Sequence, residues 1–152
     1  MKLLAALPLI LPAVNAVTLC KDFRLKVEAG IYDGAFVRKS PDNPYYVIDT
    51  SGSSGEIFEL VENILVDSDQ VSLIVGNSGE VRGALTDEVP IPGFFFFDNN
   101  YDLKLKSGDD FYVCDTDPAR WDIFGLGVVN KNWCTKVELV KARLQLNCAP
   151  WD

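Results

Sequence analysis

Histidine does not occur among the 152 residues of this chain. Its absence excludes the Ser-His-Asp and Cys-His arrangements of nucleophilic catalysis, because both use an imidazole as the general base. A zinc site is not expected either, because histidine is absent and the four cysteines include no Cys-x-x-Cys pair. A Gly-x-Ser-x-Gly elbow and a glycine-rich phosphate loop are missing as well. We therefore expect no metal, no cofactor and no enzymatic activity.

Basic residues are outnumbered by acidic ones, 14 to 22, which leaves a net charge of −8. An acidic chain is repelled by phosphate backbones and by anionic membrane surfaces, so we expect neither nucleic acid nor membrane as a partner. The C-terminal residues 144–152 have no hydrophobic tail of the kind that a lipid anchor requires. Such acidity is typical of solubility in an extracellular medium.

The longest apolar run lies at the N-terminus. Lys2 precedes an apolar run over residues 3–13, which ends in the small-x-small sequence Val14-Asn15-Ala16. This pattern is typical of a secretory signal peptide, and two prolines make the run a poor membrane-spanning helix. We expect residues 1–16 to be a signal peptide and residues 17–152 to be a single all-β domain, secreted to the extracellular space or the cell wall.

Four cysteines, an even number in a chain predicted to be secreted, indicate two disulfides. They are Cys20, Cys114, Cys134 and Cys148, and they allow three pairings. We favour Cys114–Cys134, which would close a local loop between neighbouring strands, and Cys20–Cys148, which would join the two ends of the domain. On the chain-entropy model, a loop of more than about 100 residues adds on the order of 4–5 kcal/mol.

Short strands separated by turns are predicted along the whole domain. Residues 23–27 and 101–106 alternate apolar and charged side chains, the pattern of half-buried strands. Residues 71–75 and 81–85 flank the turn sequence Gly76-Asn77-Ser78-Gly79, which predicts a hairpin. Strand-like segments recur about every ten residues, and no window keeps a helical period. We expect a compact antiparallel β-sandwich or barrel.

A β-trefoil is the rival architecture. Similar strands start at Phe23, Phe58, Asp102 and Val137, with spacings of 35, 44 and 35 residues that do not make a regular period. The chain length suits a trefoil, and an antiparallel sandwich fits equally well. The sandwich or barrel is favoured.

Carboxylates are the remaining candidates for chemistry, because a glycosidase needs only two of them and calcium prefers oxygen ligands. The strand alternation places most of them in turns or on solvent-facing sides, so surface acids and turn chemistry are the favoured interpretations. The residues concerned are Glu56, Glu59, Glu62, Asp109 and Asp110, and the Asp-x-Asp sequences at 67–69 and 115–117.

Four consecutive aromatic residues, Phe94, Phe95, Phe96 and Phe97, cannot all enter one core, because successive strand side chains alternate in direction. Either the segment is buried on both faces, which is favoured, or two rings reach the surface. Exposed rings would form a platform for sugars or for a protein partner. We take these four residues and Trp151 as the candidate binding patch. Trp121 is expected in the core, and Trp133 is expected to pack on a disulfide.

Three segments carry a resemblance to a known family. They are the strand-turn-strand of residues 71–85, the pair Phe111-Tyr112-Val113-Cys114 and Trp121-Asp122-Ile123-Phe124, and residues 132–142 around Cys134. Their order and spacing resemble the PhiA-type cell wall proteins of filamentous fungi, over roughly Phe58 to Ala142. The resemblance implies a secreted surface protein without known enzymatic chemistry, linked to hyphal and spore-bearing cell walls. It supports the Cys114–Cys134 pair and indicates no catalytic residue.

Together these observations favour a non-enzymatic fungal cell wall or surface protein with a structural or adhesive role. Its partner would be cell wall polysaccharide or another extracellular protein. One alternative is a secreted effector or inhibitor that binds a host or competitor protein. Another is a glycan-binding or glycoside-active protein. The sequence leaves the oligomeric state open.

Overall fold

The computed structural model describes residues 17–52, 54–62, 64–114, 124–142 and 148–150, with the main chain alone for residues 17–19 and 148–150. The predicted signal peptide, the Asp-x-Asp sequence at 115–117, Trp121 and Trp151 lie outside the described residues.

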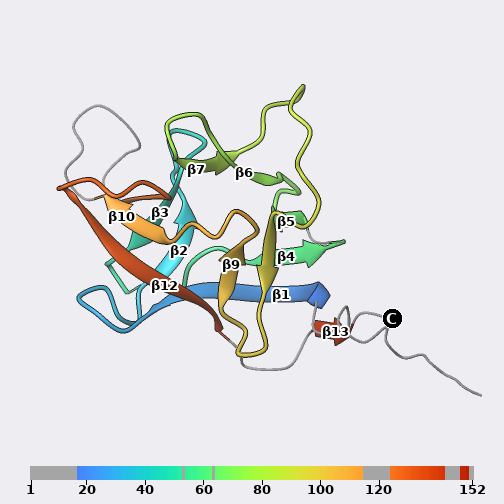
Figure 1. The fold of residues 1–152 in the computed structure, drawn as a ribbon, viewed down its shortest axis with the longest axis horizontal. Helices are drawn as coiled ribbons and strands as arrows, with labels where there is room; N and C mark the ends of the chain where they lie inside the picture. The colour runs from blue at the N-terminus through green and yellow to red at the C-terminus, as the bar shows by residue number, and fades with distance from the viewer. Residues whose placement is uncertain (1–16, 53, 63, 115–123, 143–147, 151–152) are drawn as a thin grey trace, which may run out of the picture.

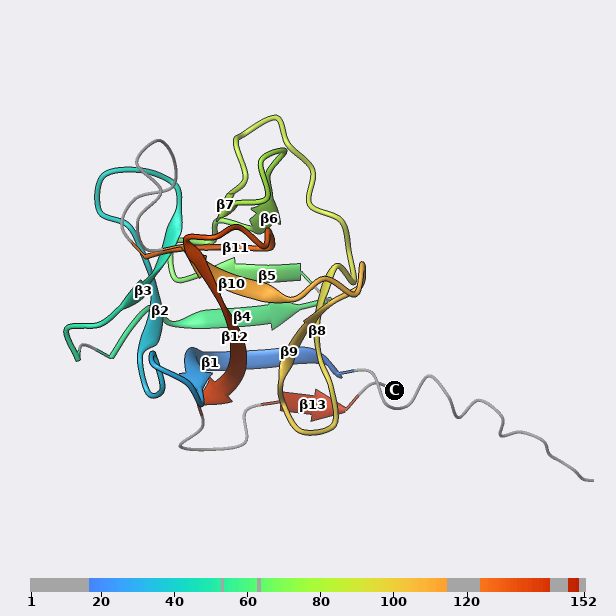
Figure 2. The same cartoon turned by 60° about the vertical axis from the view of Figure 1, so that its left-hand side comes forward.

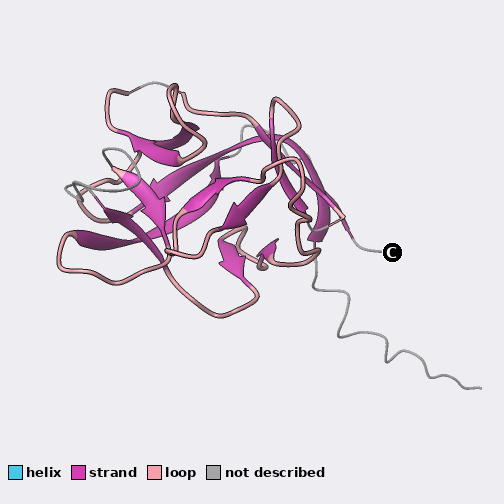
Figure 3. Cartoon of the chain, turned by 90° about the horizontal axis from the view of Figure 1, so that it is seen from above, coloured by secondary structure: helices cyan, strands magenta, loops and turns pink. Residues whose placement is uncertain are grey.

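Strands make up all of the regular secondary structure in the described residues (Figure 3). They are β1 (Val17–Glu28), β2 (Phe36–Lys39), β3 (Tyr46–Asp49), β4 (Phe58–Val61), β5 (Ile64–Asp67), β6 (Leu73–Val75), β7 (Val81–Gly83), β8 (Phe95–Phe97), β9 (Leu103–Leu105), β10 (Phe111–Cys114), β11 (Gly125–Gly127), β12 (Cys134–Ala142) and β13 (Cys148–Pro150). The predicted all-β class is confirmed.

Six of these strands form a closed antiparallel barrel in the order β1, β2, β3, β11, β10 and β12, with β12 pairing back onto β1 (Figures 1 and 2). Five further strands, β4, β5, β8, β9 and β13, extend the sheet of the barrel. The hairpin β4–β5 and the strand β13 pair with the N-terminal half of β1, and β8 joins it at Val17. The hairpin β6–β7 forms a separate two-stranded sheet. The predicted barrel is thereby confirmed.

The barrel strands come from the two ends of the chain, residues 17–49 and 111–142, while β4 to β9 lie outside it. Three equal repeats would each supply the same share of the barrel. The β-trefoil rival therefore does not describe this fold. Of the four strands that look alike in sequence, β1 and β12 belong to the barrel and pair with each other, whereas β4 and β9 lie outside it.

Strand β1 connects the barrel to its extension because it bends at a bulge. Its register shifts between Cys20 and Phe23, and Asp22 between them has a positive φ of 52°. A bulge of this kind increases twist and redirects a strand. On its C-terminal side, Phe23, Leu25 and Val27 point inward and are buried, as the alternating sequence predicts. The Phe23 ring meets that of Phe97 edge-on at 5.1 Å.

One of the two predicted disulfides is present. Cys114 on β10 and Cys134 on β12 are direct cross-strand neighbours and are bonded to each other. The second predicted bond involves Cys148, whose side chain lies outside the described atoms. The main chain of β1 and β13 places Cys20 directly opposite Cys148. The Cys20–Cys148 bond stays a prediction that this register supports.

Candidate binding groove beside β6

The four-phenylalanine run divides into two buried and two half-buried rings. Phe95 and Phe97 are 2% and 0% exposed and belong to the core, so they cannot contact a ligand at the surface. Phe94 and Phe96 are half-buried. The alternation of β8 thus places every second ring inside, and the expected patch of four rings does not form. Trp151, its fifth member, lies outside the described residues.

The two half-buried rings lie in different surroundings. Phe96 stands opposite the exposed Lys104 on the pair β8–β9. Phe94 packs against the core and meets the Phe95 ring edge-on at 5.4 Å. Phe94 also lines an apolar groove of about 330 Å³. Trp133 is 40% exposed although its neighbour Cys134 is bonded.

We call this groove the β6 groove. Strand β6 forms one side, the loop that follows β7 forms the other, and Phe94 contributes the aromatic surface. The lining residues are Leu73, Ile74, Val75, Glu88, Val89, Ile91 and Phe94. Six of these seven side chains are apolar, so the groove suits an apolar occupant.

The predicted hairpin at residues 71–85 forms the β6 side. Gly76 N donates to Glu80 O at 2.8 Å, and Gly79 occupies a left-handed conformation with φ 86°. A Cβ on Gly79 would lie 2.3 Å from a methyl carbon of Val129, so the turn also requires glycine for space. The side chains of Leu73 and Val81, on the inner face of the hairpin, are buried in the core.

The loop at residues 84–94 forms the opposite side and projects from the body of the molecule (Figures 1 and 2). Three of its aliphatic side chains face solvent: Leu85 is 58%, Val89 85% and Ile91 63% exposed. Pro90 and Pro92 alternate with Val89 and Ile91 and have no N–H to donate, which keeps the loop from pairing as a central strand. The loop therefore presents apolar side chains on an extended main chain.

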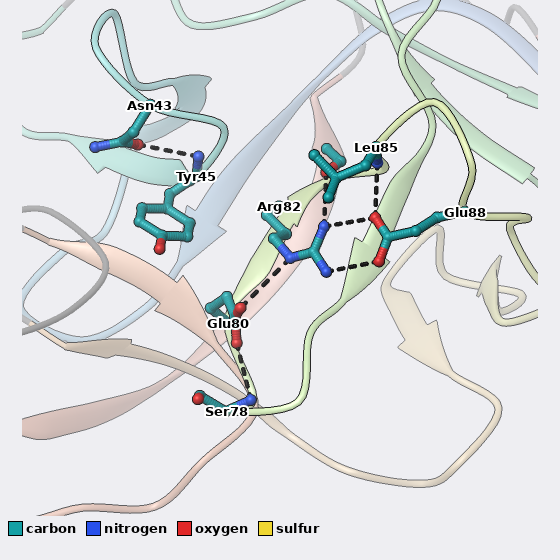
Figure 4. Close-up of polar contacts among 8 residues, drawn as sticks. Asn43, Tyr45, Ser78, Glu80, Arg82, Leu85 and Glu88 are labelled. Carbon is teal, nitrogen blue, oxygen red and sulfur yellow. Dashed lines mark hydrogen bonds and ion pairs between the residues drawn. The ribbon is translucent and has the colours of Figure 1, made fainter.

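An ion pair fixes the start of this loop (Figure 4). Arg82 donates from Nη1 and Nη2 to the two oxygens of Glu88 at 2.7 and 2.8 Å. Glu88 also accepts from the Leu85 amide at 2.6 Å, while Arg82 Nε lies 3.4 Å from Glu80. The bond from Arg82, followed by that from the Leu85 amide, lowers the pKa of Glu88 to about 2. Sequence reasoning missed this pair, since no local spacing rule links a strand residue to a loop residue.

The predicted turn chemistry at Asp67 is confirmed. Its Oδ1 accepts the main-chain N–H groups of Asp69 and Val71 at 2.9 and 3.0 Å. The carboxyl group is fully buried, and its Oδ2 accepts from the Tyr46 hydroxyl at 2.6 Å and lies 3.6 Å from Lys39 Nζ. Burial, and then the hydrogen bond to Asp67, raise the pKa of Tyr46 well above its usual value. This network fastens β5 and the following turn to the barrel.

Of the five glycosidase candidates, Glu62, Asp109 and Asp110 are exposed, whereas Glu56 and Glu59 are half-buried. Glu56 accepts from the Ser68 hydroxyl. A different acid, Asp102, borders two polar hollows of about 100 and 500 Å³. Burial, and then the charge of Asp98, raise its pKa. Within the described residues, no group of three or more His, Cys, Asp or Glu residues is placed to hold a metal ion.

Comparison of the chain with protein-family models, with curated proteins and with solved structures found no match. Among the described residues, no helix is long and apolar enough to cross a membrane. The Cys114–Cys134 disulfide is compatible with an extracellular protein.

Proposed function

We propose that this chain is a secreted, non-enzymatic protein of the cell wall or cell surface, which acts by holding another extracellular protein in the β6 groove. The leader-like N-terminus supports secretion. The resemblance of three segments to PhiA-type fungal cell wall proteins supports the location. The barrel serves as a rigid scaffold for the groove.

One observation carries the binding role. Val89 and Ile91 are 85% and 63% exposed, yet they stand beside an apolar groove on a loop anchored by Arg82 and Glu88. Single exposed aliphatic side chains are common on protein surfaces, whereas apolar side chains gathered at a groove mark interaction sites. Covering a Val or an Ile completely contributes about 1.5–3 kcal/mol each.

The lining favours a protein partner over a polysaccharide. Sugars stack on exposed aromatic faces and bond to polar groups at the same site. In the β6 groove the single aromatic ring, Phe94, is half-buried, and the single charged group, Glu88, is already bonded to Arg82 and Leu85. The aliphatic side chains match the apolar centres of protein–protein interfaces.

The test measures retention of the mature protein on isolated cell wall material from the producing cells. We expect Ile91→Ser to reduce retention at least about tenfold, which corresponds to about 1.4 kcal/mol. Ile31→Ser is the matched control, because Ile31 is 79% exposed and lies in the turn between β1 and β2. Equal retention of both variants and the parent would refute a role for the groove.

A purified-polymer arm separates the two partner classes. Chitin and β-glucan, stripped of protein, replace the wall material in the same assay. Retention on the intact wall but not on the stripped polymers supports a protein partner. Equal retention on the stripped polymers would contradict it and return the role to a polysaccharide.

The net charge of −8 favours one second candidate, a secreted effector that remains in the medium and binds a foreign protein. The same groove would serve it. Fractionation distinguishes the two functions: a wall protein accumulates in the wall fraction, whereas an effector accumulates in the culture medium.

A further inference from the structure

The β6 groove runs along the edge of a strand. Leu73, Ile74 and Val75 are consecutive, and all three line it. Because neighbouring side chains of a strand point to opposite faces, a groove over one face would contact only every second residue. Contact with all three residues therefore places the groove beside the main chain of β6.

The hydrogen bonds of the hairpin show which main-chain groups face that edge. Gly76 N donates to Glu80 O, and Ala84 N donates to Ser72 O, both at 2.8 Å. In an antiparallel pair, hydrogen-bonded positions alternate, so Ile74 directs its N–H and C=O toward Arg82. The main-chain groups of Val75 then point away from β7, toward the opposite edge.

That edge has little pairing within the described residues. Strand β6 pairs with β7, and on its other side β5 covers only its start, where Val66 bridges Ser72 and Asp67 N donates to Val71 O at 2.9 Å. Val75 lies beyond this pairing. The loop across the groove does not complete the sheet, since Pro90 and Pro92 interrupt its donors. An edge strand of this kind is a template for an added strand.

We propose that the β6 groove receives an extended segment of another extracellular protein as an additional strand beside β6. The main chain of the segment bonds at Val75, and its alternate apolar side chains pack on Phe94 and against Val89 and Ile91. This mode takes its affinity from main-chain hydrogen bonds and its selectivity from side-chain pockets. It rests on the proposed function, because it specifies the partner of the same groove.

The charges around the groove indicate the composition of the bound segment. Glu80, Asp87 and Glu88 carry three negative charges, and Arg82 carries one positive charge, so this region has an excess of acid. Asp87 is exposed next to the groove residue Glu88. Opposite charges across an interface favour encounter and register. The segment that fits is apolar at alternate positions and carries Lys or Arg between them.

The experiment uses the full mature protein and a capped synthetic hexapeptide in which lysine and valine alternate. Binding is followed by titration calorimetry and by the chemical shift of the Val75 amide. We expect saturable binding, a shift at Val75, and an at least tenfold loss with Ile91→Ser but not with Ile31→Ser. Asp87→Lys should weaken binding at low salt.

A second peptide isolates the main-chain bonds without changing the protein. It has the same sequence but carries N-methyl groups on alternate amides, which removes the donors along one edge. Strand addition predicts that a peptide methylated along the edge that faces β6 binds at least tenfold more weakly than the unmethylated peptide. Equal affinity of both peptides, or no binding of either, would overturn strand addition.

The two proposals fail in different ways. If wall retention depends on Ile91 while the parent and methylated peptides behave alike, the groove binds its partner without a shared sheet. If wall retention is indifferent to Ile91, the proposed function itself fails, whatever the peptides do.

Discussion

Arg82 of β7 and Glu88 of the following loop form a two-pronged ion pair with N–O distances of 2.7 and 2.8 Å. Glu88 is thereby held where it also accepts the Leu85 amide. The pair closes the first turn of the loop, so that Val89 and Ile91 leave the turn on the groove side. A charged pair outside the core thus sets the direction of apolar side chains.

Arg82→Lys tests this anchor. A lysine keeps the positive charge but cannot present the two parallel N–H groups that a carboxylate accepts. We expect hydrogen exchange of the Leu85 amide to accelerate, and the pKa of Glu88 to rise toward its ordinary value, while the barrel amides keep their protection. Unchanged exchange at Leu85 would show that the loop is held by other contacts. Lys136→Arg, on β12, is the control for a basic exchange at the surface.

The pH dependence of the loop follows from Glu88. Its pKa falls from 4.5 to about 2 because of the bond from Arg82, followed by that from the Leu85 amide. A carboxyl group with a lowered folded-state pKa stabilises the fold above the unfolded-state pKa, and that contribution is lost as the pH falls through the folded value. We expect the groove to persist at pH 4 and to loosen near pH 2. A carbon-13 titration of the Glu88 carboxyl measures this, and a midpoint near 4.5 would contradict it.

Local pattern was enough to predict several of the strands and the hairpin, but not β2, β3 or β5. The alternation at 23–27 predicts which side of β1 is buried, and the sequence Gly76-Asn77-Ser78-Gly79 predicts the turn between β6 and β7. Barrel closure was predicted only as one option beside a sandwich, because it depends on β12 pairing with β1 across more than 100 residues. No short-range pattern specifies that contact.

The binding groove could not be derived in the same way. The run of four aromatic residues, Phe94 to Phe97, predicts a binding patch, yet the two-residue period of β8 places Phe95 and Phe97 inside the core. The lining of the groove comes from β6, from a proline-containing loop and from Phe94, which are brought together by the tertiary fold. The nearest signal in the sequence was the segment Pro90-Ile91-Pro92-Gly93, which indicated a surface loop.

The two faces of β8 should respond differently to mutation. Phe95→Ser empties a core site and places a hydroxyl there, and we expect a loss of about 3–5 kcal/mol, as for large-to-small changes at buried aromatic sites. Phe96→Ser should cost less than half as much, because that ring is half-buried and lies beside Lys104. Chemical denaturation of both variants gives the comparison. Similar losses would show that β8 is buried on both faces.

The Cys114–Cys134 bond should contribute measurably to stability. It joins two neighbouring strands and closes a loop with a sequence separation of 20 residues. The chain-entropy model gives about 3 kcal/mol for a loop of this size. We expect the free energy of unfolding of the double variant Cys114→Ala/Cys134→Ala, measured by chemical denaturation, to be lower by that amount. A loss below about 1 kcal/mol would mean that the strand pairing restricts the loop without the bond.

Tyr46→Phe removes the hydroxyl that donates to the buried Asp67 at 2.6 Å. Asp67 keeps its bonds from the Asp69 and Val71 amides but loses a donor on Oδ2, so we expect a cost of about 1–3 kcal/mol.

The raised pKa of Tyr46 adds a pH dependence to this prediction. A tyrosine whose folded-state pKa exceeds the unfolded value stabilises the fold fully below about pH 10 and loses that contribution as the pH rises further. Above about pH 10, the free energy of unfolding of the parent should therefore fall more steeply with pH than that of the Tyr46→Phe variant. Ultraviolet difference spectra should record the Tyr46 phenolate only on unfolding. Ionisation of all five tyrosines in the folded protein at pH 10–11 would contradict the buried network.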